Sequence, residues 1–152
     1  MRKRKNNKLI LFIVLGVIVL CGIGIGVYFV IDNNKKIPDK KDNIKEEIFE
    51  SKNIVILTHE VPDGDAVGSS LAMYMGLKQL GKEVDVIIPK YSKTFEFLPC
   101  ANEIKAEGKN ENYDLAIALD CGDIKRLNGF ANYFEDANTK IQIDHHEANT
   151  MF

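Results

Sequence analysis

The stretch NIVILTHEVPDGDAVGSSLAMYMGLKQLGKEVDVIIP, residues 53–89, decides the fold. It opens with a continuous apolar run, NIVILTH (53–59), of the kind found in buried parallel strands. Apolar residues at helical spacing follow over 66–81, and this segment ends on Gly81, a typical helix stop. A second apolar run at 84–89 predicts the next strand. The order strand, helix, strand predicts a parallel unit of an α/β sheet.

The same alternation continues toward the carboxyl end. KTFEFLPCANEI (93–104) predicts a short irregular or helical crossover. YDLAIALD (113–120) and KIQIDHH (140–146) predict two further strands. Between them, IKRLNGFANYFEDA (124–137) predicts a helix that is broken near Asn128-Gly129. We therefore expect a doubly wound α/β fold with a parallel sheet.

The N-terminal part has a different composition. Residues 1–8 (MRKRKNNK) carry five positive charges, and residues 9–31 (LILFIVLGVIVLCGIGIGVYFVI) are 23 uncharged, mostly apolar residues. About 20 such residues span a bilayer, whereas a signal peptide has a shorter apolar core and a small-residue cleavage site. This pattern predicts one transmembrane helix over 9–31 and a charged linker over 32–52. The globular domain is then expected over 53–152.

The charge balance of the rest restricts its partners. After residue 31 the chain has 15 Lys and Arg against 22 Asp and Glu. Such an acidic domain is not built to bind duplex nucleic acid through a broad basic face. It is compatible with divalent cations and with small anionic substrates. The three cysteines show no CxxC spacing, so they suggest neither a disulfide framework nor a thiolate zinc site.

Metal-binding residue types gather at the ends of the predicted strands. The histidines of the chain are His59, His145 and His146, and all three follow strands. Acidic residues share these ends: Asp63, Asp65, Asp120, Asp123 and Asp144. Turns favour Asp, which explains PDGD alone but not the same chemistry at three strand ends. Ligand sites form outside the carboxyl ends of parallel strands, so we expect a metal site there.

The ligand types also indicate which metal is bound. Carboxylates and imidazoles without a thiolate suit Mn²⁺, Mg²⁺ or a related divalent ion. Two such ions form the usual clamp for displacement at phosphorus. The residues therefore predict a site for divalent ions, and a pair of such ions would suit chemistry at phosphorus.

Three segments resemble a known family. HEVPDGDAVGSSLAM (59–73), LDCGD (119–123) and IDHHEAN (143–149) resemble the first three motifs of the DHH phosphoesterase superfamily, in the same order. The GDAVGSSLA part is similar to the branch that contains nanoRNase/pAp phosphatases and RecJ-like exonucleases. The resemblance covers about residues 50–152, and the apolar N-terminal run lies outside it.

The resemblance implies a role for each matching residue. It implies a first metal held by His59, Asp63 and Asp120. It implies a second metal held by Asp65, Asp120 and His145, with Asp120 bridging the two.

For substrate, the resemblance implies that His146 contacts a phosphate and that Asp144 fixes an imidazole tautomer. Gly68 and Ser69 open a helix whose N-terminus can face phosphate. Helix entry and close packing remain an alternative role for these two residues. The catalytic set implied is Asp120, His146 and Asp144.

Two functions are compatible with this sequence. The first is a two-metal phosphoesterase that uses two divalent ions, with Mn²⁺ expected, to hydrolyse small nucleotides or short oligoribonucleotides. The alternative is an inactive, membrane-anchored fragment. Family members continue past the DHH motif with a fourth ligand of the second metal and a separate substrate-binding domain, whereas this chain stops at Phe152.

The orientation in a membrane follows from two opposed signals, and the oligomeric state stays open. The basic residues of 1–8 favour a cytoplasmic N-terminus, which would export the domain. Nucleotide substrates and Mn²⁺ chemistry favour a cytoplasmic domain. We expect a single-pass membrane protein with its domain on the cytoplasmic side.

Overall fold

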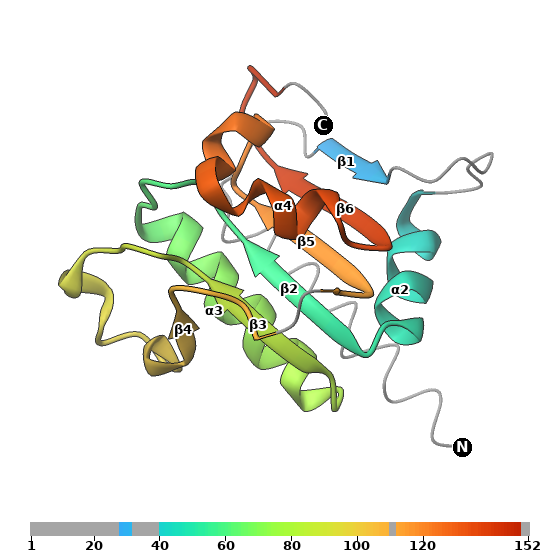
Figure 1. The fold of residues 1–152 in the computed structure, drawn as a ribbon, viewed down its shortest axis with the longest axis horizontal. Coiled ribbons are helices and arrows are strands. Elements are labelled where there is room, and N and C mark those ends of the chain that lie inside the picture. Colours follow the sequence, from blue (N-terminus) through green and yellow to red (C-terminus); the bar gives the residue numbers. More distant parts are fainter. Residues whose placement is uncertain (1–27, 32–39, 110–111, 150–152) are drawn as a thin grey trace.

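The computed structural model describes residues 28–31, 40–109 and 112–149. Within these residues the chain forms a six-stranded sheet with the strand order β1-β6-β5-β2-β3-β4 (Figure 1). The strands are β1 Tyr28–Ile31, β2 Asn53–Leu57, β3 Glu83–Ile87, β4 Ile104–Lys105, β5 Leu115–Leu119 and β6 Thr139–Asp144. Strands β2 to β6 pair in parallel, and β1 pairs antiparallel with β6. The predicted parallel α/β sheet is confirmed.

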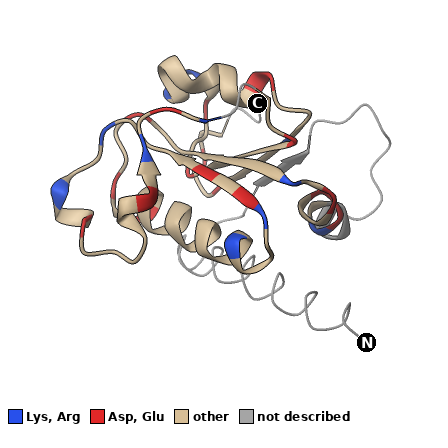
Figure 2. Cartoon of the chain, turned by 60° about the horizontal axis from the view of Figure 1, so that its bottom comes forward, with Lys and Arg blue, Asp and Glu red and all other residues tan. Residues whose placement is uncertain are grey.

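Helices cover both faces of this sheet (Figure 2). The α-helices are α2 Lys40–Glu50, α3 Gly64–Gln79 and α4 Ala131–Glu135, and the 3₁₀ helices are η1 Lys93–Phe95, η2 Ala101–Glu103 and η3 Ile124–Phe130. Ile48 of α2 and Leu71 of α3 share one core cluster with Ile56 of β2. Phe134 of α4 belongs to a second cluster with Val55 of β2. Because adjacent residues of β2 join different clusters, the two cores lie on opposite faces of the sheet.

Strand β5 shows why this part of the sequence reads as a continuous apolar run. All five of its residues are buried. Leu115, Ile117 and Leu119 belong to the cluster on the α3 face. Ala116 and Ala118 belong to the cluster on the α4 face. A strand covered on both faces needs apolar residues at every position, so alternation is lost.

The path of the chain produces a topological switch in the middle of the sheet. From β2 the chain passes through α3 to β3 and β4 on one side. From β5 it passes through η3 and α4 to β6 on the other side. Strands β2 and β5 are therefore neighbours whose following connections diverge. Ligands of open α/β sheets bind outside the carboxyl ends of the strands at such a switch point.

The expected transmembrane helix over 9–31 requires correction. Its last four residues, Tyr28–Ile31, form strand β1, which pairs with β6 from Ile31 opposite Ile141 to Tyr28 opposite Asp144. In the described part of the chain, no helix is long and apolar enough to cross a membrane. Residues 9–27 lie outside the described residues. A helix spanning 9–31 is thus wrong, and so is the single-pass membrane localisation drawn from it. The physical reason is that an apolar run suits a strand as well as a membrane helix.

The expected linker 32–52 is also corrected in part, because it contains a helix that packs on the domain. Residues 40–50 form helix α2. Ile44 and Ile48, one helical turn apart, are buried in the core on the α3 face of the sheet. The domain therefore packs this helix against the sheet ahead of β2.

Candidate metal centre

Three neighbouring strands bring histidine and aspartate side chains to one edge of the sheet. His59 follows β2, Asp120 directly follows β5, and His145 and His146 directly follow β6. Because these strands are parallel and adjacent, their carboxyl ends meet. This is also the edge at the topological switch between β2 and β5. The structure thus brings together all three histidines of the chain and Asp120.

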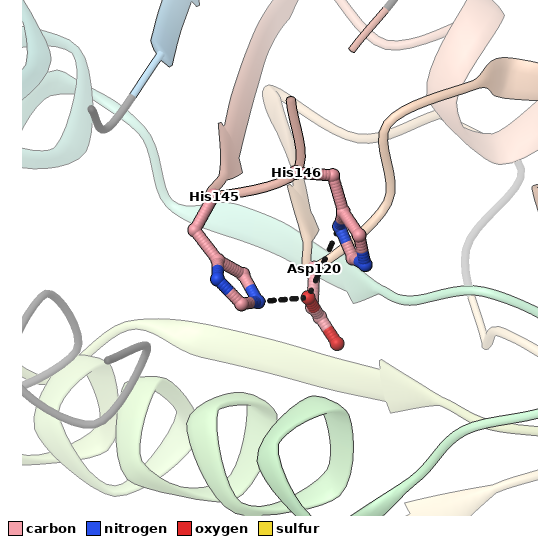
Figure 3. Close-up of side chains that lie close together, drawn as sticks. All are labelled: Asp120, His145 and His146. Carbon is pink, nitrogen blue, oxygen red and sulfur yellow. Dashed lines mark ion pairs between the residues drawn. The ribbon is translucent and has the colours of Figure 1, made fainter. Parts of the chain in front are cut away.

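Asp120 lies at the centre of this group. Its Oδ2 is 3.6 Å from Nε2 of His59. Its Oδ1 is 3.2 Å from Nε2 of His145 and 3.6 Å from Nδ1 of His146, and Figure 3 shows both rings turned toward it. The side chain is almost fully buried, at 2% exposure. One buried carboxylate therefore faces imidazoles from two different strand ends.

The backbone of Asp120 explains how its side chain reaches this position. Its φ is 54°, in the left-handed region. Its N–H donates to the carbonyl oxygen of Ile143 in the neighbouring strand at 3.0 Å. The left-handed residue ends β5 abruptly and turns the carboxylate across the sheet edge. Asp and Asn adopt this conformation more readily than other residues with a side chain.

The loop between β2 and α3 supplies two more carboxylates. Asp63 is the N-cap of α3, and its Oδ1 accepts a hydrogen bond from the N–H of Ala66 at 3.3 Å. Asp65 stands in the first turn of the helix, with Oδ2 3.5 Å from Nε2 of His145. Gly64 separates them, and the ring of Phe95 lies 3.6 Å from where a Gly64 Cβ would be. The capping turn thus presents both carboxylates to the strand ends.

These two carboxyl groups interact with each other. A hydrogen bond between them lowers the pKa of Asp63 and raises the pKa of Asp65. Two carboxyls that share a proton in this way titrate as a pair. The arrangement indicates a site with more negative charge than it holds comfortably without a cation.

The side chains form two groups with the geometry of metal ligands. One ligand atom from each of His59, Asp63 and Asp120 lies within 4.8 Å of the others, and the same holds for Asp120, His145 and His146. Asp120 belongs to both groups. The sharing of one carboxylate between two groups is the arrangement that two-metal sites use.

The burial and protonation of this centre fit a divalent cation. Burial, followed by the charge of Asp65, raises the pKa of Asp120 to about 6. Burial also lowers the pKa of His59, which favours the neutral imidazole that metals bind. Within the described residues, Asp120 Oδ1 and His59 Nδ1 are buried without a hydrogen-bond partner. Such orphaned atoms are costly unless something else satisfies them, so the donor set fits a bound cation.

Asp144 holds His146 in a different environment. Nδ1 of His146 is 2.7 Å from Oδ1 of Asp144, and its backbone N–H is 3.3 Å from Oδ2. Asn149 donates to Oδ2 at 2.7 Å. A proton on Nδ1 lets the His146 ring donate to the carboxylate of Asp144. This hydrogen bond raises the pKa of His146, the opposite direction to His59.

Three residues noted in the sequence stand apart from the two groups. Asp123 caps η3, with Oδ1 accepting from the N–H of Lys125 at 2.9 Å. Ser69 is buried, and its hydroxyl donates to the carbonyl of Ala66 within α3. Gly68 has open space where a Cβ would be. The substrate role implied for Gly68 and Ser69 therefore stays a prediction.

Two residues near the centre had no role in the sequence analysis. Asn149 contacts Asp144, as described above. Arg126 lies close enough for its charge to act on His59 and His146. Arg126 has one signal in the sequence, because it is the only arginine after residue 31. Asn149 has none beyond its place in the third motif.

Comparison with known proteins supports the assignment of the fold and the motifs. Residues 53–152 match the family model described as the DHH family, N-terminal domain. The bifunctional oligoribonuclease and PAP phosphatase NrnA of Thermus thermophilus is 37% identical over 102 residues, which cover 65% of this chain and 29% of that protein. The crystal structure of an exopolyphosphatase-related protein from Bacteroides fragilis superposes with a TM-score of 0.65 at 29% identity. That match covers 70% of this chain and 34% of the crystallised one.

The chain thus spans about a third or less of the length of these two proteins. The family match nevertheless takes in every strand-end residue of the two ligand groups. This chain belongs to the DHH family, through the N-terminal domain that residues 53–152 match.

Proposed function

We propose that this chain carries the metal centre of a two-metal phosphoesterase that acts on small nucleotides or short oligoribonucleotides. The observation that carries the proposal is Asp120, a buried carboxylate shared by two ligand groups at the switch point of the sheet. When bound, two divalent cations would stabilise charge on phosphoryl oxygens and ease the deprotonation of water.

The contacts support a division of the ligands between two cations. His59, Asp63 and Asp120 form one group and would hold the first. His145 lies close to both Asp65 and Asp120, so these three would hold the second. Asp120 offers one oxygen toward His59 and the other toward His145, as a bridging ligand requires.

His146 is assigned to substrate rather than to metal, although its ring also lies near Asp120. Its Nδ1 is occupied by the hydrogen bond to Asp144. The same bond raises the pKa of His146. A ring held by this bond can turn its other nitrogen toward a phosphoryl oxygen and donate to it when protonated. Asp144 would hold that ring in place.

The donor set favours Mn²⁺ among the divalent ions, with Mg²⁺ as the next choice. The ligands are carboxylates and imidazoles. Cys121 is close by in the sequence, but burial raises the pKa of its thiol to about 11 and its Sγ–H donates to the carbonyl of Asp123. A thiolate, which zinc and softer metals prefer, is therefore not offered at this edge.

The proposed substrates follow from the chemistry of the site and from the named relative. The Thermus thermophilus protein is an oligoribonuclease and PAP phosphatase, which suggests substrates with a nucleotide phosphate. Basic residues are scattered over the described part of the fold (Figure 2). A duplex needs a continuous basic face, so a short single-stranded substrate is the better fit.

The alternative function, an inactive membrane-anchored fragment, gains no support. The helix expected over 9–31, from which its anchor was inferred, is corrected by strand β1 at Tyr28–Ile31. Each residue expected to bind metal in the DHH domain also stands at the same sheet edge. A remnant has no need to keep these costly carboxylates together.

Mn²⁺-dependent release of phosphate tests the proposal. We expect the 152-residue chain with Mn²⁺ to release phosphate from 3′-phosphoadenosine 5′-phosphate and to cleave ribodinucleotides. Chelation with EDTA should stop both reactions, and so should Asp120→Asn. Release is measured by a colorimetric phosphate assay and cleavage by chromatography. Activity that survives in Asp120→Asn would exclude the proposed metal centre.

The pH dependence of Mn²⁺ binding gives a second test. Burial raises the pKa of Asp120 to about 6. A metal binds only the ionised carboxylate, so the proton must leave first. The affinity should therefore be nearly constant above pH 7 and fall by about tenfold per pH unit below 6. Calorimetry across pH 5 to 8 measures this, and an affinity that does not change between pH 5 and 7 would contradict it.

A further inference from the structure

Arg126 is a chemical exception in this chain. After residue 31 there are 15 basic residues, of which 14 are lysine and Arg126 is the single arginine. Lysine is a flexible, strongly hydrated point charge. Arginine has a planar fork of donors that matches the oxygens of a phosphate and binds them in pairs. A position that needs only charge is equally well served by lysine.

The position of Arg126 is fixed by the loop that leads to the metal centre. It is the third residue of η3, which follows β5 and Asp120. Its carbonyl oxygen accepts a hydrogen bond of 2.8 Å from the N–H of Glu60, the residue after His59. Asn128, two residues further on, donates through Nδ2 to Oε2 of Glu60 at 2.6 Å. The segment that carries Arg126 is thus bonded twice to the residue beside a ligand of the first group.

The charge of Arg126 reaches the centre. Burial is the largest cause of the lowered pKa of His59, and the Arg126 guanidinium is the second. Asp144 dominates the raised pKa of His146, and Arg126 opposes that rise. These directions agree with the bonds to Glu60, which hold the segment of Arg126 beside the strand end that carries His59.

The guanidinium is also available for binding. Arg126 is exposed to solvent. Within the described residues, no carboxylate lies within ion-pair distance of it, although four carboxylates stand at the neighbouring sheet edge. An arginine beside so many acids normally pairs with one of them. In the part of the chain that the structure describes, Arg126 forms no ion pair, and it lies next to the centre proposed to act on phosphate.

We propose that Arg126 is a substrate-binding residue whose guanidinium binds phosphate oxygens of the nucleotide at the metal centre. The inference rests on the proposed function, because it takes a phosphorylated nucleotide as the ligand. The carboxylates of the centre repel an anionic substrate unless bound cations or basic side chains offset their charge. Arg126 adds a fixed cation that persists when metal ions exchange, and its fork favours a terminal phosphate with several free oxygens.

Binding of adenosine 5′-monophosphate to the full chain tests this inference. The ligand has one terminal phosphate. Calorimetry with the Mn²⁺-loaded protein compares the original chain with Arg126→Gln, Arg126→Lys and Lys125→Gln. Lys125 is the matched control, since it is the adjacent exposed residue of η3 with the same charge. The hydrogen bond from Glu60 uses the backbone of Arg126, so the substitutions keep it.

We expect Arg126→Gln to weaken binding by about tenfold to hundredfold, the usual effect of losing hydrogen bonds to a charged group. Arg126→Lys should restore part of the affinity, because it keeps the charge and loses the fork. Lys125→Gln should bind as the original chain does. Mn²⁺ content and melting temperature should be the same in all four proteins.

Two results of the binding experiment would overturn the inference. One is equal affinity in Arg126→Gln and Lys125→Gln, which would reduce Arg126 to a general surface charge. The other is no binding of adenosine 5′-monophosphate by the Mn²⁺-loaded original chain. Failure of the proposed function looks different: the chain would bind the nucleotide through Arg126 but hydrolyse neither 3′-phosphoadenosine 5′-phosphate nor dinucleotides. Hydrolysis with an unchanged KM in Arg126→Gln would keep the function and remove Arg126 from it.

Discussion

Asp120→Asn is expected to lose both metal ions and, at pH 7.5, to make the metal-free protein more stable. The loss follows from the place of Asp120 in both ligand groups. An amide lacks the negative charge that the two cations need, and it is a poorer ligand. We expect less than a tenth of the original Mn²⁺ to remain after gel filtration, measured by elemental analysis.

The gain in stability follows from the pKa of Asp120. Burial raises it to about 6 in the folded chain, above the value of about 3.9 in an unfolded one. Because its pKa is raised, the Asp120 carboxyl contributes its full stability to the fold below about pH 4, and this contribution is lost as the pH rises through about 6. At pH 7.5 the metal-free fold therefore contains an ionised, buried carboxylate, at a cost of up to about 3 kcal/mol. Asparagine carries no such charge.

Asparagine is the appropriate substitution because of the backbone. Asp120 has a φ of 54°, which asparagine adopts more readily than alanine does. In thermal unfolding with EDTA at pH 7.5, the free energy of unfolding of Asp120→Asn should exceed that of the original chain by about 1 to 3 kcal/mol. At pH 4 the two free energies should be nearly equal. Asp123→Asn is the control, since asparagine caps η3 as aspartate does. If Asp120→Asn kept one equivalent of Mn²⁺ at full affinity, Asp120 would not be shared.

His145→Ala and His146→Ala should fail in opposite ways, although the two residues are adjacent and their rings lie 4.8 Å apart. His145 faces two carboxylates, Asp65 and Asp120. His146 is bonded to Asp144 and has a raised pKa. We therefore expect His145→Ala to lose one of two equivalents of Mn²⁺, and His146→Ala to retain both.

The turnover number kcat of the variants distinguishes the roles of His145 and His146 further. His146→Ala should lower kcat by about 10²- to 10³-fold, the usual effect of removing one donor to a developing oxyanion. Asp144→Asn should lower kcat by about 10- to 100-fold with its metals intact, because it disturbs the orientation of His146. Metal analysis and steady-state kinetics of the three variants measure this. Equal loss of metal from His145→Ala and His146→Ala would show that His146 is a ligand and that its assignment to phosphate is wrong.

The sequence predicted the parts of the fold that follow from local patterns. The strands around 53–59, 84–89, 113–120 and 140–146 are confirmed, because a strand buried on both faces leaves a continuous apolar run. The break near Asn128 is confirmed by its φ of 48°. Local chemistry also marked the strand ends, since the preference of turns for Asp does not explain His and Asp together at three of them.

The rest depended on partners that lie far away in the sequence. Tyr28–Ile31 form a strand only because the edge of β6 is available to them. The left-handed conformation of Asp120 is tied to a hydrogen bond with Ile143, 23 positions away. The nearness of Arg126 to His59 depends on the bond to Glu60 across the sheet edge. None of these contacts leaves a local pattern, so a single sequence does not reveal them.

The dispersal of the proposed ligands over three strand ends also constrains the order in which the protein is completed. A partly folded chain with only β2, α3 and β3 offers His59, Asp63 and Asp65 but lacks the shared Asp120. His145 arrives only when β6 pairs with β5. Cations that bind the finished set stabilise the fully paired sheet by mass action and give partial folds little help. Bound metal would thus stabilise only the completely assembled sheet. In a denaturant titration, Mn²⁺ binding and the spectroscopic signal of the strands should then be lost at the same denaturant concentration.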